Sequence, residues 1–249
     1  MPDIPTYRCR RLDRKADAPT ADLDQAPWSE TEWIEDFVLV GGPEPPPDRF
    51  LSAAARWDDE GLNVAFKSAP SLVPVTKTQR DDDLFNECTV EIFMAAGKGF
   101  YEIEVNPLNT VVDLLLSKSW GQNGRGYFDW SPQFATAVHI EGTINDPSDR
   151  DQYWSVEMAL PWSIFASDML DVAGGRQLPP RPGDEWRCNF YRYEPLRTGG
   201  VETDVEYSAW SPVGEIDFHR PDRFGTVVFA EASTQVMQLT WGTVKTWPC

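Results

Sequence analysis

Two neighbouring stretches decide the fold: Cys88-Thr-Val-Glu-Ile-Phe-Met94 and Phe100-Tyr-Glu-Ile-Glu-Val-Asn106. In each stretch apolar and polar side chains alternate one by one, which is the pattern of a half-buried antiparallel strand. A Gly-containing turn signal separates the two stretches, so we expect them to pair. Pairing would place Glu91 near Glu102 or Glu104 on one side of a sheet.

The same alternation recurs outward from this pair, in residues 61–67 and 153–160. Further strands are expected over residues 51–57, 110–117, 134–141, 186–193 and 225–230. The 21 Pro and 17 Gly residues fall mostly between these segments as turn signals, and only Pro161 is well placed to begin a short helix. The sequence therefore predicts one all-β domain over residues 1–249. We expect an antiparallel β-sandwich of the jelly-roll or immunoglobulin-like type, with one or two short helices and residues 232–249 as a C-terminal extension.

The charge balance excludes several classes of partner. The 249 residues include 22 Lys and Arg against 40 Asp and Glu, for a formal net charge of −18. Nucleic-acid backbones and anionic membrane surfaces both attract cationic proteins, so neither is expected as a partner. No window approaches the roughly 18 consecutive apolar residues of a membrane helix. The first residues lack the apolar core of a secretory signal, which leaves a cytoplasmic chain and a mature secreted chain both open.

Few residues offer metal, haem or nucleophilic chemistry. There are two histidines, His139 and His219, and the four cysteines are scattered without a CxxC pair. His219, with Asp and Arg residues nearby, is either an acid–base group or an ordered loop anchor. Two histidines and five methionines support axial haem ligation poorly, and no nucleotide-binding fingerprint is present. We expect no haem or nucleotide cofactor.

The paired carboxylates Glu91, Glu102 and Glu104 leave three interpretations open. They are the solvated face of a very acidic protein, the acid–base pair of a glycoside hydrolase, or hydroxyl acceptors on the floor of a sugar site.

The densest acidic run is Asp81-Asp82-Asp83. Its carboxylates are oxygen ligands of the kind that calcium takes, although the spacing is not that of an EF-hand loop. A calcium site at these residues and a solvated loop are the two readings.

Seven motifs in order resemble a known family over about residues 20 to 230. They are Asp22-Leu-Asp-Gln-Ala-Pro-Trp28, Arg56-Trp-Asp-Asp-Glu-Gly-Leu-Asn-Val64, Arg80-Asp-Asp-Asp-Leu-Phe-Asn-Glu-Cys-Thr-Val-Glu-Ile-Phe93 followed by Tyr101-Glu-Ile-Glu-Val-Asn-Pro107, Trp154-Ser-Val-Glu-Met-Ala-Leu-Pro-Trp162, Trp186-Arg-Cys-Asn-Phe-Tyr-Arg192, Ala209-Trp-Ser-Pro212 and Phe218-His-Arg-Pro-Asp-Arg-Phe-Gly225. The set resembles family 9 carbohydrate-binding modules and their DOMON-like relatives.

The resemblance implies a β-sandwich that binds sugars, in its best-known members the ends of cellulose and xylan chains. Such modules accompany hydrolases in polysaccharide degradation and hold calcium. Two Trp rings clamp the sugar; by motif position these correspond to Phe85 and Trp210, and the Glu of the following strand corresponds to Glu91. This chain departs from the family by having Phe85 in place of Trp, and Glu104 where sugar binders tend to have a basic residue.

The leading hypothesis is binding of a poly- or oligosaccharide, or another small-molecule ligand, without catalysis. The expected binding residues are Phe85 and Trp210 for stacking, and Glu91, Glu104, Asn106 and Arg192 for hydrogen bonds. Five other tryptophans are expected in the core: Trp28, Trp57, Trp154, Trp162 and Trp186. The alternative is a standalone enzyme with Glu91, Glu104 and His219 as acid–base groups, which would cleave a glycoside or rearrange a small metabolite.

Overall fold

The computed structural model describes residues 3–40, 44–71, 74–95, 97–146, 148, 151–167, 169–170, 172–198, 201–215 and 217–232. The strands are β1 (Thr6–Arg11), β2 (Val38–Leu39), β3 (Leu51–Trp57), β4 (Gly61–Ser68), β5 (Thr89–Ala95), β6 (Phe100–Val105), β7 (Val111–Leu116), β8 (Gly126–Tyr127), β9 (Ala135–Glu141), β10 (Tyr153–Pro161), β11 (Glu185–Thr198), β12 (Val201–Ala209) and β13 (Gly225–Ala230). The short 3-10 helices are η1 (Trp28–Glu30), η2 (Pro47–Arg49), η3 (Leu84–Asn86), η4 (Trp120–Gln122), η5 (Trp162–Phe165) and η6 (Pro221–Arg223).

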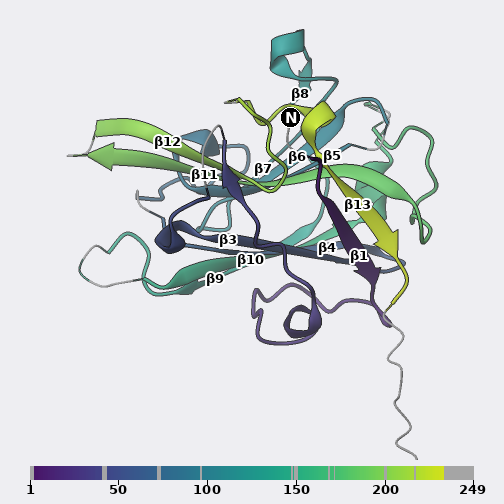
Figure 1. Ribbon diagram of the computed structural model, residues 1–249, viewed down its shortest axis with the longest axis horizontal. Helices are drawn as coiled ribbons and strands as arrows, with labels where there is room; N and C mark the ends of the chain where they lie inside the picture. Colours follow the sequence, from purple (N-terminus) through teal and green to yellow (C-terminus); the bar gives the residue numbers. More distant parts are fainter. Residues whose placement is uncertain are drawn as a thin grey trace, which may run out of the picture.

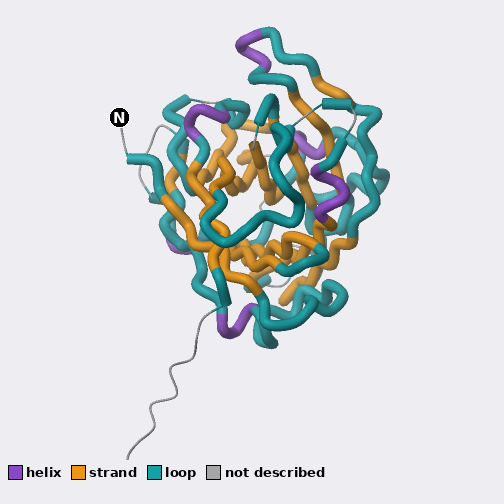
Figure 2. The backbone as a smooth tube through the Cα atoms, turned by 90° about the vertical axis from the view of Figure 1, so that its right-hand side faces the viewer, coloured by secondary structure: helices purple, strands orange, loops and turns teal. Residues whose placement is uncertain are grey.

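The strands form a curled sheet in two layers (Figures 1 and 2). One layer runs in the order β8-β7-β6-β5-β11, with β12 also paired to β11, and the other in the order β3-β4-β10-β9. Strands β13 and β1 connect the layers along one side. The expected β-sandwich is confirmed, but the pairing is not wholly antiparallel, because β1 runs parallel to both β13 and β3.

Alternating side chains explain how the layers pack. In β5 and β6 the apolar set, with Val90, Ile92 and Ile103 among its members, faces the other layer and is fully buried. Burial of such side chains stabilises the fold by about 25 cal/mol per Å² of apolar area. The five tryptophans expected in the core are all buried there or beneath the β3–β4 layer: Trp28, Trp57, Trp154, Trp162 and Trp186.

The outer face of the β5–β6–β11 layer is also largely covered. A second apolar cluster forms there, in which Phe93, Phe100 and Tyr191 pack against Phe218 and Phe224 from the loop between β12 and β13. Polar side chains on this face are therefore buried beneath a loop rather than spread over an open sheet.

The expected helix at Pro161 is only a single 3-10 turn. Pro161 ends β10 with extended backbone, and η5 follows it. Within the described residues the helical segments are all 3-10 turns, and none of them has the length and apolar character to cross a membrane. Residues 233–249, which make up nearly all of the expected C-terminal extension, lie outside the described residues.

Candidate functional site

Three carboxylates meet on the outer face of the first layer. Glu91 on β5 lies directly opposite Glu104 on β6, and Glu102 is two residues away on the same face. One carboxylate oxygen from each of the three lies within 4.8 Å of the others, although the side chains belong to residues only 5–8% exposed. The predicted proximity of Glu91 to Glu102 and Glu104 is confirmed.

Burial and mutual repulsion disfavour ionisation of this group. Burial, together with the charge of Glu102, raises the pKa of Glu91 to about 8, although the Thr89 hydroxyl donates a hydrogen bond to Glu91 at 2.9 Å. The pKa of Glu104 is raised well above its usual value, first by burial and then by the charges of Glu91 and Glu102. A carboxyl group in a low-dielectric site with like charges beside it behaves in this way.

His219 covers the group from the β12–β13 loop. Its Nε2 lies 3.2 Å from Oε2 of Glu102, and its Nδ1 lies 3.0 Å from Oδ1 of Asp217. Burial lowers the pKa of His219, but the two carboxylates outweigh that effect and hold its pKa above the usual value. The imidazole ring is therefore held between two acidic partners, and its side chain is 21% exposed.

Exposed aromatic rings stand next to this histidine. Trp120 and Phe128 come from the segment that carries η4 and β8, which projects beyond the layers at the top of Figures 1 and 2. Their rings are 6.2 Å apart and nearly parallel, at 13°, and are 42% and 66% exposed as residues. The Trp120 ring also meets His219 edge-on at 5.8 Å.

Gly126 sets the spacing of these two rings. A Cβ at this position would lie 2.6 Å from the Trp120 ring and 2.8 Å from the Phe128 ring. Phe128 could not be identified from the sequence, because the closeness of the two rings depends on the path of the backbone through the Gly124 and Gly126 region.

Of the two predicted clamp residues, only Phe85 is at the surface. Phe85 lies in η3, just before β5, and is 58% exposed. Trp210 is only 6% exposed, because its ring packs against Tyr7 and Phe190 in the core and fills the space beside Gly225. The expected role of Trp210 as a stacking ring that clamps a sugar together with Phe85 is therefore wrong.

Two other predicted ligand residues also point inward. Arg192 is 1% exposed and donates hydrogen bonds to Glu194, at 2.7 Å, and to the carbonyl of Pro70. Asn106 is fully buried; its amide group bonds to Lys77 and to the turn that follows β6. Both side chains have structural partners, so their predicted contact with a ligand is wrong.

The acidic run does not gather its carboxylates. Asp82 accepts hydrogen bonds from the backbone N–H groups of Thr78 and Gln79, and Asp83 precedes η3 without capping it. Within the described ranges, the group with the spacing of metal ligands is the glutamate trio, not Asp81, Asp82 and Asp83. Calcium binding at the run stays a prediction.

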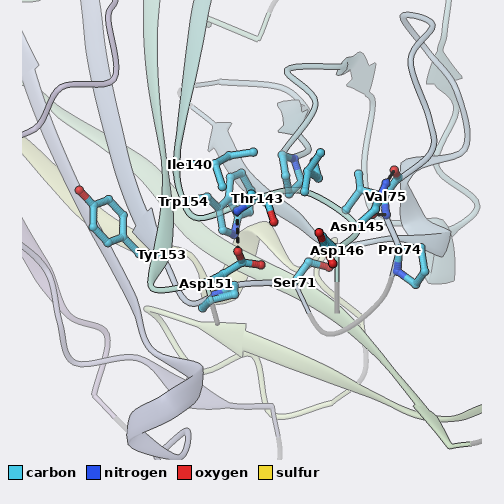
Figure 3. A pocket seen from close by; sticks show the side chains of 13 residues that line it. Ser71, Pro74, Val75, Ile140, Thr143, Asn145, Asp146, Asp151, Tyr153 and Trp154 are labelled. Atoms are coloured by element: carbon cyan, nitrogen blue, oxygen red, sulfur yellow. Dashed lines mark hydrogen bonds between the residues drawn. The ribbon is translucent and has the colours of Figure 1, made fainter. Parts of the chain in front are cut away.

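A separate cavity of about 380 Å³ opens beside β9 and β10 (Figure 3). Its wall includes Ile140, Tyr153 and Trp154, with Pro70 and Asn145 from the flanking loops. Asn145 exchanges two hydrogen bonds of 2.7 Å with the backbone of Val75, which fixes that side of the wall. The cavity shares no residue with the glutamate trio.

Comparison with known proteins places this sandwich in a family. The sequence profile described as carbohydrate-binding family 9 matches residues 49–229, most of the chain. The chain belongs to carbohydrate-binding family 9. None of the curated proteins matches it.

Solved structures share the fold of this family 9 chain. A Bacteroides uniformis ATCC 8492 protein, provisionally described as carbohydrate-binding, is 16% identical, with a TM-score of 0.67 over 91% of this chain and 100% of its own. A family 9 module from Caldicellulosiruptor kristjanssonii, in complex with cellotriose, is 13% identical, with a TM-score of 0.54 over 93% and 96%. The glucose complex described for the same organism is 14% identical, with a TM-score of 0.54 over 93% and 99%. At these identities the likeness shows the fold alone.

Proposed function

We propose that this family 9 chain binds the sugar units of a cellulose- or xylan-type saccharide, without catalysis, beside the carboxylate face. One observation carries the proposal: Trp120 and Phe128 present exposed, nearly parallel rings, and the Trp120 ring contacts His219, which covers Glu102. Membership of carbohydrate-binding family 9 supports it, as do the solved modules of this fold that hold cellotriose and glucose. Such a role would serve polysaccharide degradation.

The chemistry of a sugar matches these side chains. A pyranose ring presents C–H groups that pack on an aromatic face, and its hydroxyls need directional hydrogen bonds. Trp120, Phe128 and Phe85 offer the exposed rings. The side chains of Asp217 and His219, 27% and 21% exposed, offer polar contacts at the surface. Glu91 and Glu104 lie beneath them as further hydroxyl acceptors.

The enzyme alternative has its residues in place but less support. Glu91 and Glu104 belong to one group of carboxylates, and His219 contacts its third member, Glu102. However, family 9 is defined by binding rather than by catalysis, so we propose a binding protein. Incubation with cellotriose and xylotriose is expected to release no new reducing ends; a sustained release that Glu91→Gln abolishes would favour the enzyme.

Calorimetric titration with glucose, cellotriose and xylotriose tests the binding site. Trp120→Ala should weaken binding about 30-fold, because loss of a central aromatic contact costs about 2 kcal/mol. Phe128→Ala and Phe85→Ala should weaken it less. Ile4→Ala is the matched control, since Ile4 is an exposed apolar residue at 36% on the chain before β1.

Two results would contradict the proposal. One is a wild-type protein that binds none of the three sugars at millimolar concentration. The other is unchanged affinity in a folded Trp120→Ala, Phe128→Ala, Phe85→Ala triple variant, which would move the site elsewhere on the molecule.

A further inference from the structure

The glutamate trio gathers three buried carboxyl groups with few donors around them. Among the described residues, its partners outside the trio are the Thr89 hydroxyl on Glu91 and the His219 ring on Glu102, and within the trio Glu104 is hydrogen-bonded to Glu102. No described Lys or Arg forms an ion pair with Glu91, Glu102 or Glu104. Buried carboxylates are normally paired with a cation or fully hydrogen-bonded, because burial of an unpaired charge is costly. One imidazole beside three carboxylates leaves this requirement unmet.

Glu104 supplies a separate indication. Its Oε2 is buried and has no hydrogen-bond partner, in a residue that is only 8% exposed. Glu104 also belongs to the group in which one carboxylate oxygen of each member lies within 4.8 Å of the others. A buried acceptor without a donor loses its hydration without compensation. A cation in this space would satisfy it.

The spacing of the oxygens fits a metal ion. Calcium binds carboxylate oxygens at about 2.3–2.6 Å, so two ligands of one ion can lie up to about 5 Å apart. The three carboxylates offer ligand atoms within 4.8 Å of one another, so a single central ion can reach all three. They come from adjacent paired strands, and a sheet holds such positions rigidly.

We propose that Glu91, Glu102 and Glu104 together bind one divalent cation of the oxygen-preferring kind, with Ca²⁺ and Mn²⁺ as its test ions. Two positive charges offset most of the charge of the trio, and water or ligand hydroxyls complete the coordination. His219 acts as a positioning residue: it contacts Glu102 and is itself held by Asp217. The site is distinct from the run Asp81-Asp82-Asp83 and does not depend on sugar binding.

The test begins with the full chain stripped by a chelator and titrated with CaCl₂, MnCl₂ and MgCl₂ in the absence of sugar. Calorimetry and the electron paramagnetic resonance of Mn²⁺ should report one ion per chain. The melting temperature should rise by several degrees when the metal is added. Glu104→Gln keeps the shape of the side chain and removes its charge, so it should weaken binding at least 10-fold and abolish the thermal shift.

Asp83→Asn is the matched control, because it removes an exposed carboxylate of the acidic run and should leave metal affinity unchanged. Glu91→Gln is the second variant, with the same expected loss, should Glu104→Gln fail to fold. His219→Gln should weaken metal binding by a few-fold only, since it positions Glu102 without ligating.

Three outcomes would overturn the proposal. They are no stoichiometric binding and no thermal shift with 1–10 mM metal, equal affinity in the wild type and in both glutamine variants, or loss of binding in Asp83→Asn alone. If no metal binds and the glutamine variants are more stable than the wild type, the three carboxyl groups share protons rather than a metal ion. Metal titration without sugar and sugar titration with the chelator present keep the two proposals apart, because each measures one ligand in the absence of the other.

Discussion

Two groups of buried ionisable side chains lie on opposite faces of the same layer and differ in whether they have partners of opposite charge. Arg192 and Glu194 on β11 face the core at 1% and 0% exposure, and they neutralise each other through a 2.7 Å contact. Glu91, Glu102 and Glu104 are almost as buried on the outer face, but among the residues that the structure describes they have no basic partner beyond His219. The first group balances its charge within the fold, although Nε of Arg192 has no hydrogen-bond partner, and its role is structural. The second is incomplete, which is why it is the candidate for function.

The largest effect on the free energy of unfolding should come from breaking the Arg192–Glu194 ion pair. Arg192→Met should lower the free energy of unfolding by about 4 kcal/mol, because it leaves the Glu194 charge buried without its partner. Urea unfolding followed by tryptophan fluorescence measures this change. If the variant lost less than about 1 kcal/mol, the pair would not be the self-sufficient structural unit that the comparison requires.

Removing one carboxyl group from the glutamate trio should change the free energy of unfolding in the opposite direction. In chelator-treated protein, Glu104→Gln should raise the free energy of unfolding by about 1 kcal/mol, because a neutral amide removes the cost of burying an ionisable carboxyl beside two others and brings N–H donors to them. The same urea experiment detects the rise. A loss comparable to that of Arg192→Met would show that the trio is balanced by contacts within the fold, and the contrast between the two groups would disappear.

A surface pair gives the smallest effect and sets the scale. Arg220 donates two hydrogen bonds, of 3.0 and 2.9 Å, to Asp222, whose side chain is 58% exposed. Asp222→Asn should change the free energy of unfolding by no more than about 0.5 kcal/mol, since exposed ion pairs contribute little. A larger change in thermal or urea unfolding would mean that η6 depends on this pair for more than local charge.

The strands could be predicted because their side-chain period is visible in the sequence. The alternation in β5 and β6 predicted the inward set of apolar residues and a shared face for Glu91, Glu102 and Glu104, but it left open whether Glu102 or Glu104 lies opposite Glu91. Strands β1 and β12 were not predicted, although Tyr7 and Cys9 in β1, and Val205 and Tyr207 in β12, do alternate with polar or charged residues. The parallel pairing of β1 could not be predicted either, because it depends on which distant strands come together.

The site residues show where sequence reasoning fails. Arg192 stands between two tyrosines in the sequence, which suggests that its charged side chain faces solvent. Tyr191 takes the outer face instead, where Phe218 and Phe224 of the β12–β13 loop cover it, and Arg192 faces the core. Trp210 follows β12 and precedes Ser-Pro, which suggests a loop edge. Its backbone N–H is bound to Phe190 instead, which turns the ring into the core. In both cases a long-range contact, invisible in the local pattern, decides the direction of the side chain.

The position that spaces Trp120 and Phe128 has a practical consequence. Because Gly126 has no side chain, one added methyl group at this position acts as a wedge between two rings and the backbone beneath them. The shape of the aromatic surface can thus be altered without deleting either ring. A library of small residues at position 126 would change the shape of the Trp120–Phe128 surface, and so the shape of ligand that fits on it. The two layers of the sheet would keep their structure.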